Sequence, residues 1–295
     1  MRRFSSESLY DILQYLDAAL RSAASVSFEV PNPDENAGLY AGEHLERSVY
    51  RPLSTWYELA QELRCRMSVP LILDDGFIRL SFSKLAEEHS FHADDSNKKY
   101  SADSTFARIN KLEDPSFLRA YLESLERVDV SRGKRILSLG VNRGDELLPL
   151  ERLNTDAHIV GIDINESALQ IAKRRFGKRY SFITMDVNDL GGLGLEPFDL
   201  ILSFSTLQSP SVDDRKLLRL LVQRFLTPQG SLILGLPNSR YVDGELLYGA
   251  RLKNYARPDL SLLVRDAAYY RKYLQQHGFK VFVTGKYELL VTAIR

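Results

Sequence analysis

The sequence predicts an α/β protein, in which a mostly parallel sheet carries helices on both faces and ends in an antiparallel strand. From residue 135 onwards, short apolar stretches alternate with amphipathic stretches, the pattern of parallel strands joined by crossover helices. The last two apolar stretches, 279–284 and 288–294, are separated by only three residues. A connection that short cannot hold a crossover helix, so these two strands are expected to run antiparallel.

A smaller α+β domain is predicted before this sheet. Its expected elements are an amphipathic helix in 5–24, a loop over 27–42, a helix that starts at Ser54 or Thr55 and reaches Met67, and a β-hairpin over 71–82. Asp75-Gly76 supplies the hairpin turn. The polar run from Glu87 to Asp103 marks the boundary, which divides the chain into domains 1–103 and 104–295.

The second domain is expected to open with a helix from Pro115, because Asp114-Pro115 is a typical helix start. Its predicted strands lie at 135–139, 158–163, 180–184, 199–203, 231–235, 279–284 and 288–294. The helices between them are expected near 144–152, 166–177, 213–226 and 264–277.

Composition excludes several classes of protein. Lys plus Arg and Asp plus Glu both number 39, so no whole-surface basic field is available for nucleic acid, which is possible as a partner but not favoured. The single cysteine, Cys65, fits a reducing compartment. No apolar stretch approaches the ~20 residues that span a bilayer. The expected protein is soluble and cytoplasmic, without a membrane partner, and its oligomeric state is left open.

The strand at 135–139 stops at Gly140 and turns within a few residues into a helix. Such a turn directs backbone N–H groups at a ligand. A dinucleotide site would need glycine at 140, 142 and 145, but Asn142 and Asp145 stand there. Asp145 and Glu146 are expected to repel a pyrophosphate, and no Gly-Lys-Ser/Thr follows, so nucleotide phosphates are disfavoured at this loop.

Four segments resemble the class I S-adenosylmethionine-dependent methyltransferases. They are Ser138-Leu-Gly140-Val-Asn142-Arg-Gly144, Val160-Gly-Ile-Asp163, Thr184-Met-Asp186-Val187 and Phe198-Asp199-Leu-Ile-Leu-Ser203. Their order and the closing antiparallel pair match the family over residues 105–295. The resemblance implies a seven-stranded, Rossmann-like sheet, an enzyme, and S-adenosylmethionine as its cofactor.

The resemblance also implies roles for particular residues. Ser138 stands where the family has an acid that contacts the methionine end, and Asn142 accepts the positive φ of the glycine that it replaces. Asp163, with Ile164 beside it, would bind the ribose hydroxyls. Asp186 would bind the adenine amino group, and Val187 would pack on the ring. The remaining cofactor contacts implied are Arg108 near the carboxylate, the glycines Gly140 and Gly144, and Ser203 below the transferred methyl.

The acceptor is expected to lie under the segment 237–260, which is rich in Tyr and Arg. The residues predicted to meet the acceptor as catalytic groups are Ser203, Asn238 and Tyr241. Methyl transfer depends mostly on positioning, and a base is needed only where the acceptor loses a proton. The N-terminal domain is interpreted as a lid or substrate domain.

Three acceptor chemistries are disfavoured. Pyrimidine C5 methylation needs a cysteine nucleophile near the site, but Cys65 lies far away in the N-terminal domain. Ser203-Phe-Ser-Thr-Leu-Gln-Ser-Pro stands where amino-nucleobase enzymes have an Asp/Asn-Pro-Pro-aromatic motif. The Lys-Asp-Lys-Glu set of ribose methylation is not evident. An O or N atom of a small or medium-sized acceptor remains. Two alternatives stay open: an RNA methyltransferase using the Tyr/Arg-rich segment, and a non-catalytic module that binds S-adenosylmethionine or a partner. No metal is predicted, because His89, His92 and the aspartates after them are interpreted as a solvated linker.

Overall fold

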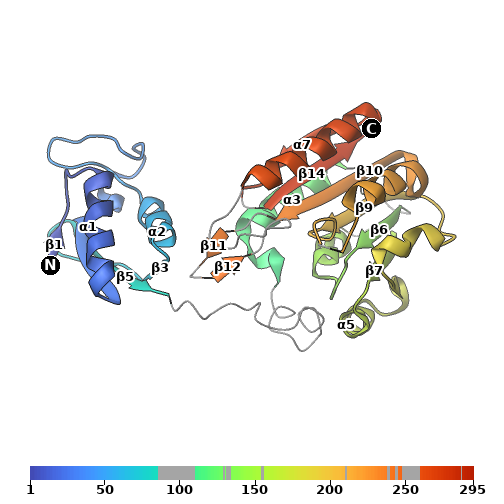
Figure 1. The fold of residues 1–295 in the computed structure, drawn as a ribbon, viewed down its shortest axis with the longest axis horizontal. Helices are drawn as coiled ribbons and strands as arrows, with labels where there is room; N and C mark the ends of the chain where they lie inside the picture. Colours follow the sequence, from blue (N-terminus) through green and yellow to red (C-terminus); the bar gives the residue numbers. More distant parts are fainter. Residues whose placement is uncertain are drawn as a thin grey trace. The chain divides into compact units, whose positions relative to one another are not determined.

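The structure, a computed structural model, describes residues 1–85, 110–128, 130, 134–153, 156–209, 211–237, 240–242, 245–247, 260–286 and 288–295. The chain divides into two compact units (Figure 1). The first comprises Met1–Ser90 and Tyr241–Leu246, and the second comprises Phe91–Arg240 and Leu247–Arg295. The expected boundary at residue 103 and the polar run before it lie outside the described residues, and the lid and acceptor roles of the domains stay predictions.

The first unit is a five-stranded sheet with two helices packed on one face. Its strands are β1 (Arg2–Arg3), β2 (Ser25–Pro31), β3 (Cys65–Met67), β4 (Leu71–Ile72) and β5 (Phe77–Lys84), in the order β1-β2-β5-β3, with β4 also on β5. The helices are α1 (Leu9–Ser22) and α2 (Leu53–Glu62), with a 3-10 turn η1 (Pro33–Asn36) between them. Both helices contribute to one core with the sheet, which includes Leu16, Trp56 and Phe28.

Two expectations for this unit are wrong. The stretch 27–42 begins inside β2, where Val26, Phe28 and Val30 alternate toward the core; its prolines mark only the end of the strand. The second helix does not reach Met67, because Arg64 adopts a positive φ of 53° and redirects the chain into β3. The hairpin over 71–82 is confirmed: β4 pairs antiparallel with β5, and the N–H of Leu73 donates to the carbonyl of Phe77.

The second unit contains the predicted seven-stranded sheet, in the order β13-β14-β10-β9-β6-β7-β8. The strands are β6 (Arg135–Leu139), β7 (His158–Asp163), β8 (Ser181–Thr184), β9 (Phe198–Phe204), β10 (Leu226–Pro237), β13 (Lys280–Thr284) and β14 (Glu288–Ile294). Pairs from β8 to β10 are parallel, and β14 runs antiparallel to both of its neighbours. The sheet and its antiparallel last strand are therefore confirmed.

Helices cover both faces of this sheet (Figure 1). One face carries α3 (Pro115–Arg127), α4 (Leu148–Arg152) and α5 (Glu166–Phe176); the other carries α6 (Asp214–Leu220), the π-helical turn η7 (Leu221–Phe225) and α7 (Leu260–Gln276). Short 3-10 turns lie at η3 (Lys111–Glu113), η4 (Asp145–Leu147), η5 (Gly177–Arg179) and η6 (Val187–Gly192). Among the described residues, none of the helices has the length and hydrophobicity to cross a membrane.

Sequence signals explain where these helices start. Asp114 accepts hydrogen bonds from the N–H groups of Ser116 and Phe117 and so caps α3, as its Asp-Pro start predicts. Asn165 caps α5 in the same way, and Gly177 follows the end of that helix at a φ of 61°. Because α5 begins three residues after Asp163, the end of β7 and the start of its helix are held close together.

Candidate functional site

The carboxyl ends of the parallel strands β6, β7 and β9 meet at one edge of the sheet, and the glycine loop lies there. Three loop residues adopt left-handed backbone conformations: Gly140 at φ 68°, Asn142 at φ 44° and Gly144 at φ 75°. The expectation that Asn142 tolerates a positive φ is therefore confirmed. A Cβ at position 140 would lie 1.9 Å from Oγ1 of Thr206, so the loop passes too close to the residues after β9 for any larger side chain.

Asp163 fastens this loop to the end of β7. One carboxylate oxygen accepts a hydrogen bond of 2.8 Å from the N–H of Asn142, and the other accepts one of 2.8 Å from the N–H of Asn165. The residue is only 9% exposed, and burial raises the pKa of its carboxyl, an effect that the backbone N–H donors oppose. Each oxygen can accept a second hydrogen bond. The carboxylate thus both holds the loop and retains capacity for hydroxyl donors.

Other residues predicted to bind the cofactor lie near this edge. Ile164 directly follows Asp163 and leaves its side chain 65% exposed. Val187 is buried, and Asp186 accepts a hydrogen bond of 2.8 Å from the N–H of Asn188, which caps η6. Asp186 therefore has a local structural role, and its role toward adenine stays a prediction.

Ser138 and Ser203 lie inside the sheet, each 1% exposed. Ser138 is aligned with Leu202 and Ser203 with Leu139, so the two side chains point to opposite faces. Within the described part of the chain neither hydroxyl has a hydrogen-bond partner. The two serines do not converge on one point, and their contacts with cofactor and acceptor stay predictions.

Three predicted residues cannot be placed as side chains. Arg108 and Asn238 lie outside the described residues. Tyr241 belongs to β11 (Arg240–Val242), which pairs with β12 (Glu245–Leu247) in a two-stranded sheet.

A polar cluster that the sequence did not predict lies at this edge of the sheet. The Nζ of Lys111 donates to the Oγ of Ser205 at 2.5 Å and to both carboxylate oxygens of Glu288 at 3.1 Å. Glu288 is only 13% exposed in its side chain, and its Oε1 lies 2.9 Å from where a Cβ of Gly235 would stand. Ser205 adopts a positive φ of 63° directly after β9 and precedes Thr206, which touches Gly140. The cluster therefore adjoins the glycine loop, and strained backbone of this kind gathers at functional sites.

Glu146 is a second acid whose environment the sequence did not predict. Burial raises the pKa of its carboxyl to about 8; a hydrogen bond to its own backbone and the charge of Lys111 oppose the rise, and Asp145 and Asp163 add to it. The adjoining Tyr121 hydroxyl donates to the Glu146 carbonyl at 2.9 Å. Near neutral pH this carboxyl is therefore largely protonated, close to the charged groups of the site.

We expect the stability of the cofactor-free protein to fall as pH rises from about 5 to about 8 because the pKa of Glu146 is higher in the folded chain than in the unfolded one. Over that window the folded state retains a proton that the unfolded state has released, so each rise in pH favours unfolding. Asp163, whose pKa is also raised, acts in the same direction. Thermal unfolding of the Glu146→Gln variant should show a weaker pH dependence and a higher Tm than the parent at about pH 9. Glu126→Gln, an exposed change on α3, is the control, and an equal pH response in the parent and Glu146→Gln would contradict the expectation.

One reason for disfavouring phosphates at the loop is wrong. Asp145 does not present a free charge, because Arg175 donates to its Oδ1 at 2.5 Å. The raised pKa of Glu146 similarly removes most of its negative charge. The tertiary structure thus neutralises both acids that the sequence offered as repulsive. In the described part of the chain, no three His, Cys, Asp or Glu side chains converge as metal ligands.

Comparisons with known proteins show what this chain is similar to. A family model described as a methyltransferase domain matches residues 130–277. Among solved structures, the chain resembles a SAM-dependent methyltransferase from Aquifex aeolicus, with 20% identity and a TM-score of 0.44 over 64% of this chain and 97% of that one. It also resembles magnesium protoporphyrin IX methyltransferase from Synechocystis PCC 6803 with bound SAM (18% identity, TM-score 0.43, 62% of this chain and 79% of that one). A third is Aeropyrum pernix fibrillarin with natively bound S-adenosyl-L-methionine (14% identity, TM-score 0.43, 60% and 74%). No curated protein matches the sequence.

Proposed function

We propose, from the premise that this chain belongs to the methyltransferase-domain family, that it methylates an O or N atom of a small or medium-sized acceptor. The chain is an S-adenosylmethionine-dependent methyltransferase, and S-adenosylmethionine is its cofactor. The atom that receives the methyl group, and the size of the acceptor, are the parts proposed here. The observation that supports an O or N acceptor is the Lys111–Ser205–Glu288 cluster, whose carboxylate can accept a proton beside the glycine loop.

The residues at the carboxyl edge fit the cofactor's chemistry. Asp163 can accept hydrogen bonds from ribose hydroxyls, and the exposed Ile164 offers an apolar contact next to it. Ser138 replaces the acid that the family usually has. Glu146 supplies a carboxyl group nearby, and a bound ammonium group would favour the ionised form of that carboxyl. We therefore assign Glu146, rather than Asp145, to the amino-acid end of the cofactor.

The cofactor supplies a methyl group on a positively charged sulfur, which leaves as a neutral thioether. When bound, it would offer an electrophilic methyl carbon to the acceptor atom, and the electron pair of the broken carbon–sulfur bond would stay on sulfur. A hydroxyl or a protonated nitrogen must then release a proton. We assign that proton to the carboxylate of Glu288, which Lys111 holds in place and to which the Ser205 hydroxyl donates at 3.3 Å.

The environment of Cys65 supports an O or N acceptor. Pyrimidine C5 methylation needs a cysteine nucleophile, and Cys65 is the single cysteine of the sequence. Its side chain is 2% exposed in the core of the first unit, and burial raises the pKa of its thiol. A buried thiol with a raised pKa is a poor nucleophile.

We expect the Glu288→Gln variant to lower kcat by about tenfold to a hundredfold, because the amide keeps the shape of the side chain but cannot take up a proton. Cofactor affinity, measured by calorimetry, should stay close to that of the parent. A lower kcat with an unchanged affinity for the cofactor and an unchanged Tm separates this role from a structural one. Glu126→Gln is the control. An unchanged kcat, or a loss of activity explained wholly by weaker cofactor binding, would show that Glu288 has no part in the mechanism.

The proposal is tested with S-adenosylmethionine carrying a 13C-labelled methyl group, offered to metabolite, protein and RNA fractions. We expect labelled product in the metabolite fraction, with a methyl resonance characteristic of attachment to oxygen or nitrogen. A methyl group on carbon or sulfur would contradict the proposal. Label in the RNA fraction would replace it with the RNA methyltransferase alternative.

A further inference from the structure

The loop that follows β9 is joined to α6 and α7 by three buried side chains. Gln208 belongs to this loop, Tyr270 lies on α7 and Asp214 begins α6, and they are 5%, 0% and 8% exposed. We propose that these three side chains, here called the Tyr270 network, are positioning residues. They fix the loop 205–209 and, through it, the glycine loop that binds the cofactor.

The direction of each hydrogen bond in the Tyr270 network follows from the protons that its groups carry. The Tyr270 hydroxyl donates its single proton to Oδ2 of Asp214 at 2.9 Å. Its oxygen therefore accepts from Gln208, whose amide Nε2 lies 3.3 Å away. The carboxylate thus orients the hydroxyl, and the hydroxyl orients the amide group at the end of the loop.

The loop 205–209 carries two residues of the site. Ser205 has a positive φ of 63°, and its Oγ donates to Glu288 at 3.3 Å. Thr206 lies against Gly140, and its Oγ1 donates to the carbonyl of Leu139 at 3.0 Å. A backbone conformation of this kind persists where the surrounding contacts enforce it. The Tyr270 network supplies such contacts two residues after Thr206.

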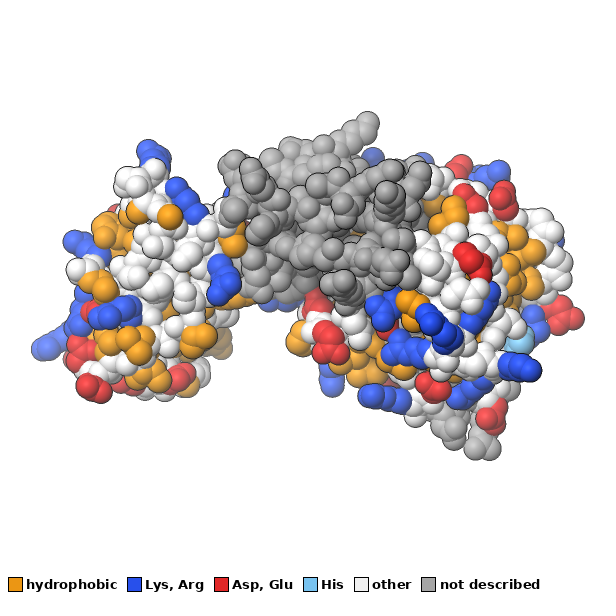
Figure 2. Space-filling view, turned by 90° about the horizontal axis from the view of Figure 1, so that it is seen from below, with side chains coloured by type: hydrophobic (Ala, Val, Ile, Leu, Met, Phe, Trp, Pro, Cys, Tyr) orange, Lys and Arg blue, Asp and Glu red, His pale blue; other side chains and the backbone are white. Residues whose placement is uncertain are grey.

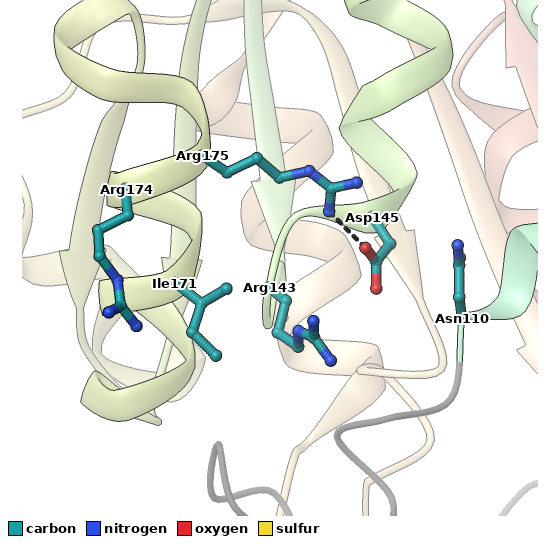
Figure 3. Close-up of a pocket in the computed structure, with 6 residues that line it drawn as sticks. All are labelled: Asn110, Arg143, Asp145, Ile171, Arg174 and Arg175. Carbon is teal, nitrogen blue, oxygen red and sulfur yellow. Dashed lines mark hydrogen bonds and ion pairs between the residues drawn. The ribbon is translucent and has the colours of Figure 1, made fainter.

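The glycine loop also has supports that do not involve the Tyr270 network. Arg175 of α5 donates to Asp145 at 2.5 Å, as the close-up shows (Figure 3). Asp163 accepts the N–H of Asn142 at 2.8 Å. Because both contacts remain when the network is broken, its loss should loosen the glycine loop at Thr206 without unfolding the domain.

A purely structural explanation accounts less well for the Tyr270 network. Figure 2 shows Lys, Arg, Asp and Glu side chains of the larger unit at its surface, whereas Asp214 is nearly buried. Within the described residues, Oε1 of Gln208 is buried and has no hydrogen-bond partner. An apolar side chain of similar size would pack there without the cost of an unsatisfied polar atom. Polar groups kept at such a cost point to a need for one defined loop position.

The test measures the affinity of the two-unit protein for S-adenosylmethionine by calorimetry, with no methyl acceptor present. We expect Tyr270→Phe to weaken binding about fivefold to tenfold, because the hydroxyl that joins Gln208 to Asp214 is lost. Thr227→Val is the matched control. It also removes a hydroxyl that donates to an aspartate, Asp199, at 3.1 Å, but at the opposite end of the sheet. Its affinity should equal that of the parent.

A double-variant cycle separates positioning from a general loss of stability. In the proposal Tyr270 acts on the cofactor through Thr206, so adding Tyr270→Phe to Thr206→Ala should change the affinity by less than about twofold. Gln208→Leu should weaken binding as Tyr270→Phe does, and the two together should weaken it no more than either alone. A merely structural role would leave the affinity of every variant that still folds unchanged, with folding measured by thermal unfolding.

The outcomes are distinct. A parent-like affinity in Tyr270→Phe, an equal loss in Thr227→Val, or full additivity with Thr206→Ala would overturn the proposal; if Tyr270→Phe does not fold, Gln208→Leu decides the same question. Only the part that Ser205 plays beside Glu288 rests on the proposed function. Absence of labelled product from the parent would remove that part, whereas the effect on cofactor affinity is measured without it.

Discussion

The Asp163→Ala variant is expected to lose both stability and most of its affinity for S-adenosylmethionine. The substitution leaves the N–H groups of Asn142 and Asn165 without their carboxylate acceptors. Buried donors left unsatisfied cost about 1–3 kcal/mol each, so the free energy of unfolding should drop measurably. Loss of the ribose acceptor should weaken cofactor binding by about 1–3 kcal/mol more, and release of the glycine loop adds to this. Chemical denaturation and calorimetry measure the two effects separately.

Asp199→Ala is the matched control for that experiment. Asp199 also accepts two hydrogen bonds, from the N–H of Arg135 at 3.0 Å and from Thr227 Oγ1 at 3.1 Å. It lies at the start of β9, at the opposite end of the sheet from the glycine loop. Its alanine variant should lose stability to a similar extent but keep its cofactor affinity. Equal loss of affinity in both variants would show that Asp163 acts only through the fold.

The Gly140→Ala variant is expected to destabilise the sheet domain strongly. The new Cβ would stand 1.9 Å from Thr206 Oγ1, and the φ of 68° disfavours any side chain. Overpacking and left-handed strain together should lower the free energy of unfolding by about 2–5 kcal/mol. Because the loop must shift to relieve the contact, cofactor binding should fall below detection. Thermal unfolding and calorimetry are the measurements.

Two further variants identify the cause of that loss. Gly192→Ala adds a methyl group where nothing lies within 4 Å, and it should leave stability nearly unchanged. Thr206→Ala removes Oγ1 and with it a hydrogen bond of 3.0 Å to the carbonyl of Leu139. If close contact is the main cost, the Gly140→Ala/Thr206→Ala double variant should be more stable than the sum of the single changes predicts. If the stability changes of the two single variants simply add in the double variant, the cost of Gly140→Ala arises from backbone strain alone.

The errors in the N-terminal unit have a common physical origin. Pro31, Pro33 and the glycines of 27–42 indicated a loop, but β2 is held by pairing with β5, which lies about fifty residues further along the chain. The helical spacing of apolar residues continued to Met67, yet the left-handed turn at Arg64 allows Cys65–Met67 to pair with the same strand. In both places long-range strand pairing prevailed over local propensity.

By itself the sequence determined the alternating strands and helices, the antiparallel closing pair, the helix caps and the left-handed tolerance of Asn142. These features follow from local periodicity and from the intrinsic backbone preferences of each residue type, which do not depend on the rest of the fold. Only the tertiary structure brought Lys111, Ser205 and Glu288 together, since they are separated by 94 and by 177 positions and no local pattern links them. It also paired Arg175 with Asp145 and desolvated the carboxyl of Glu146, which neutralised two acids beside the glycine loop. Charge and pKa depend on neighbours that packing selects, and for that reason the chemistry of the site was decided by the fold.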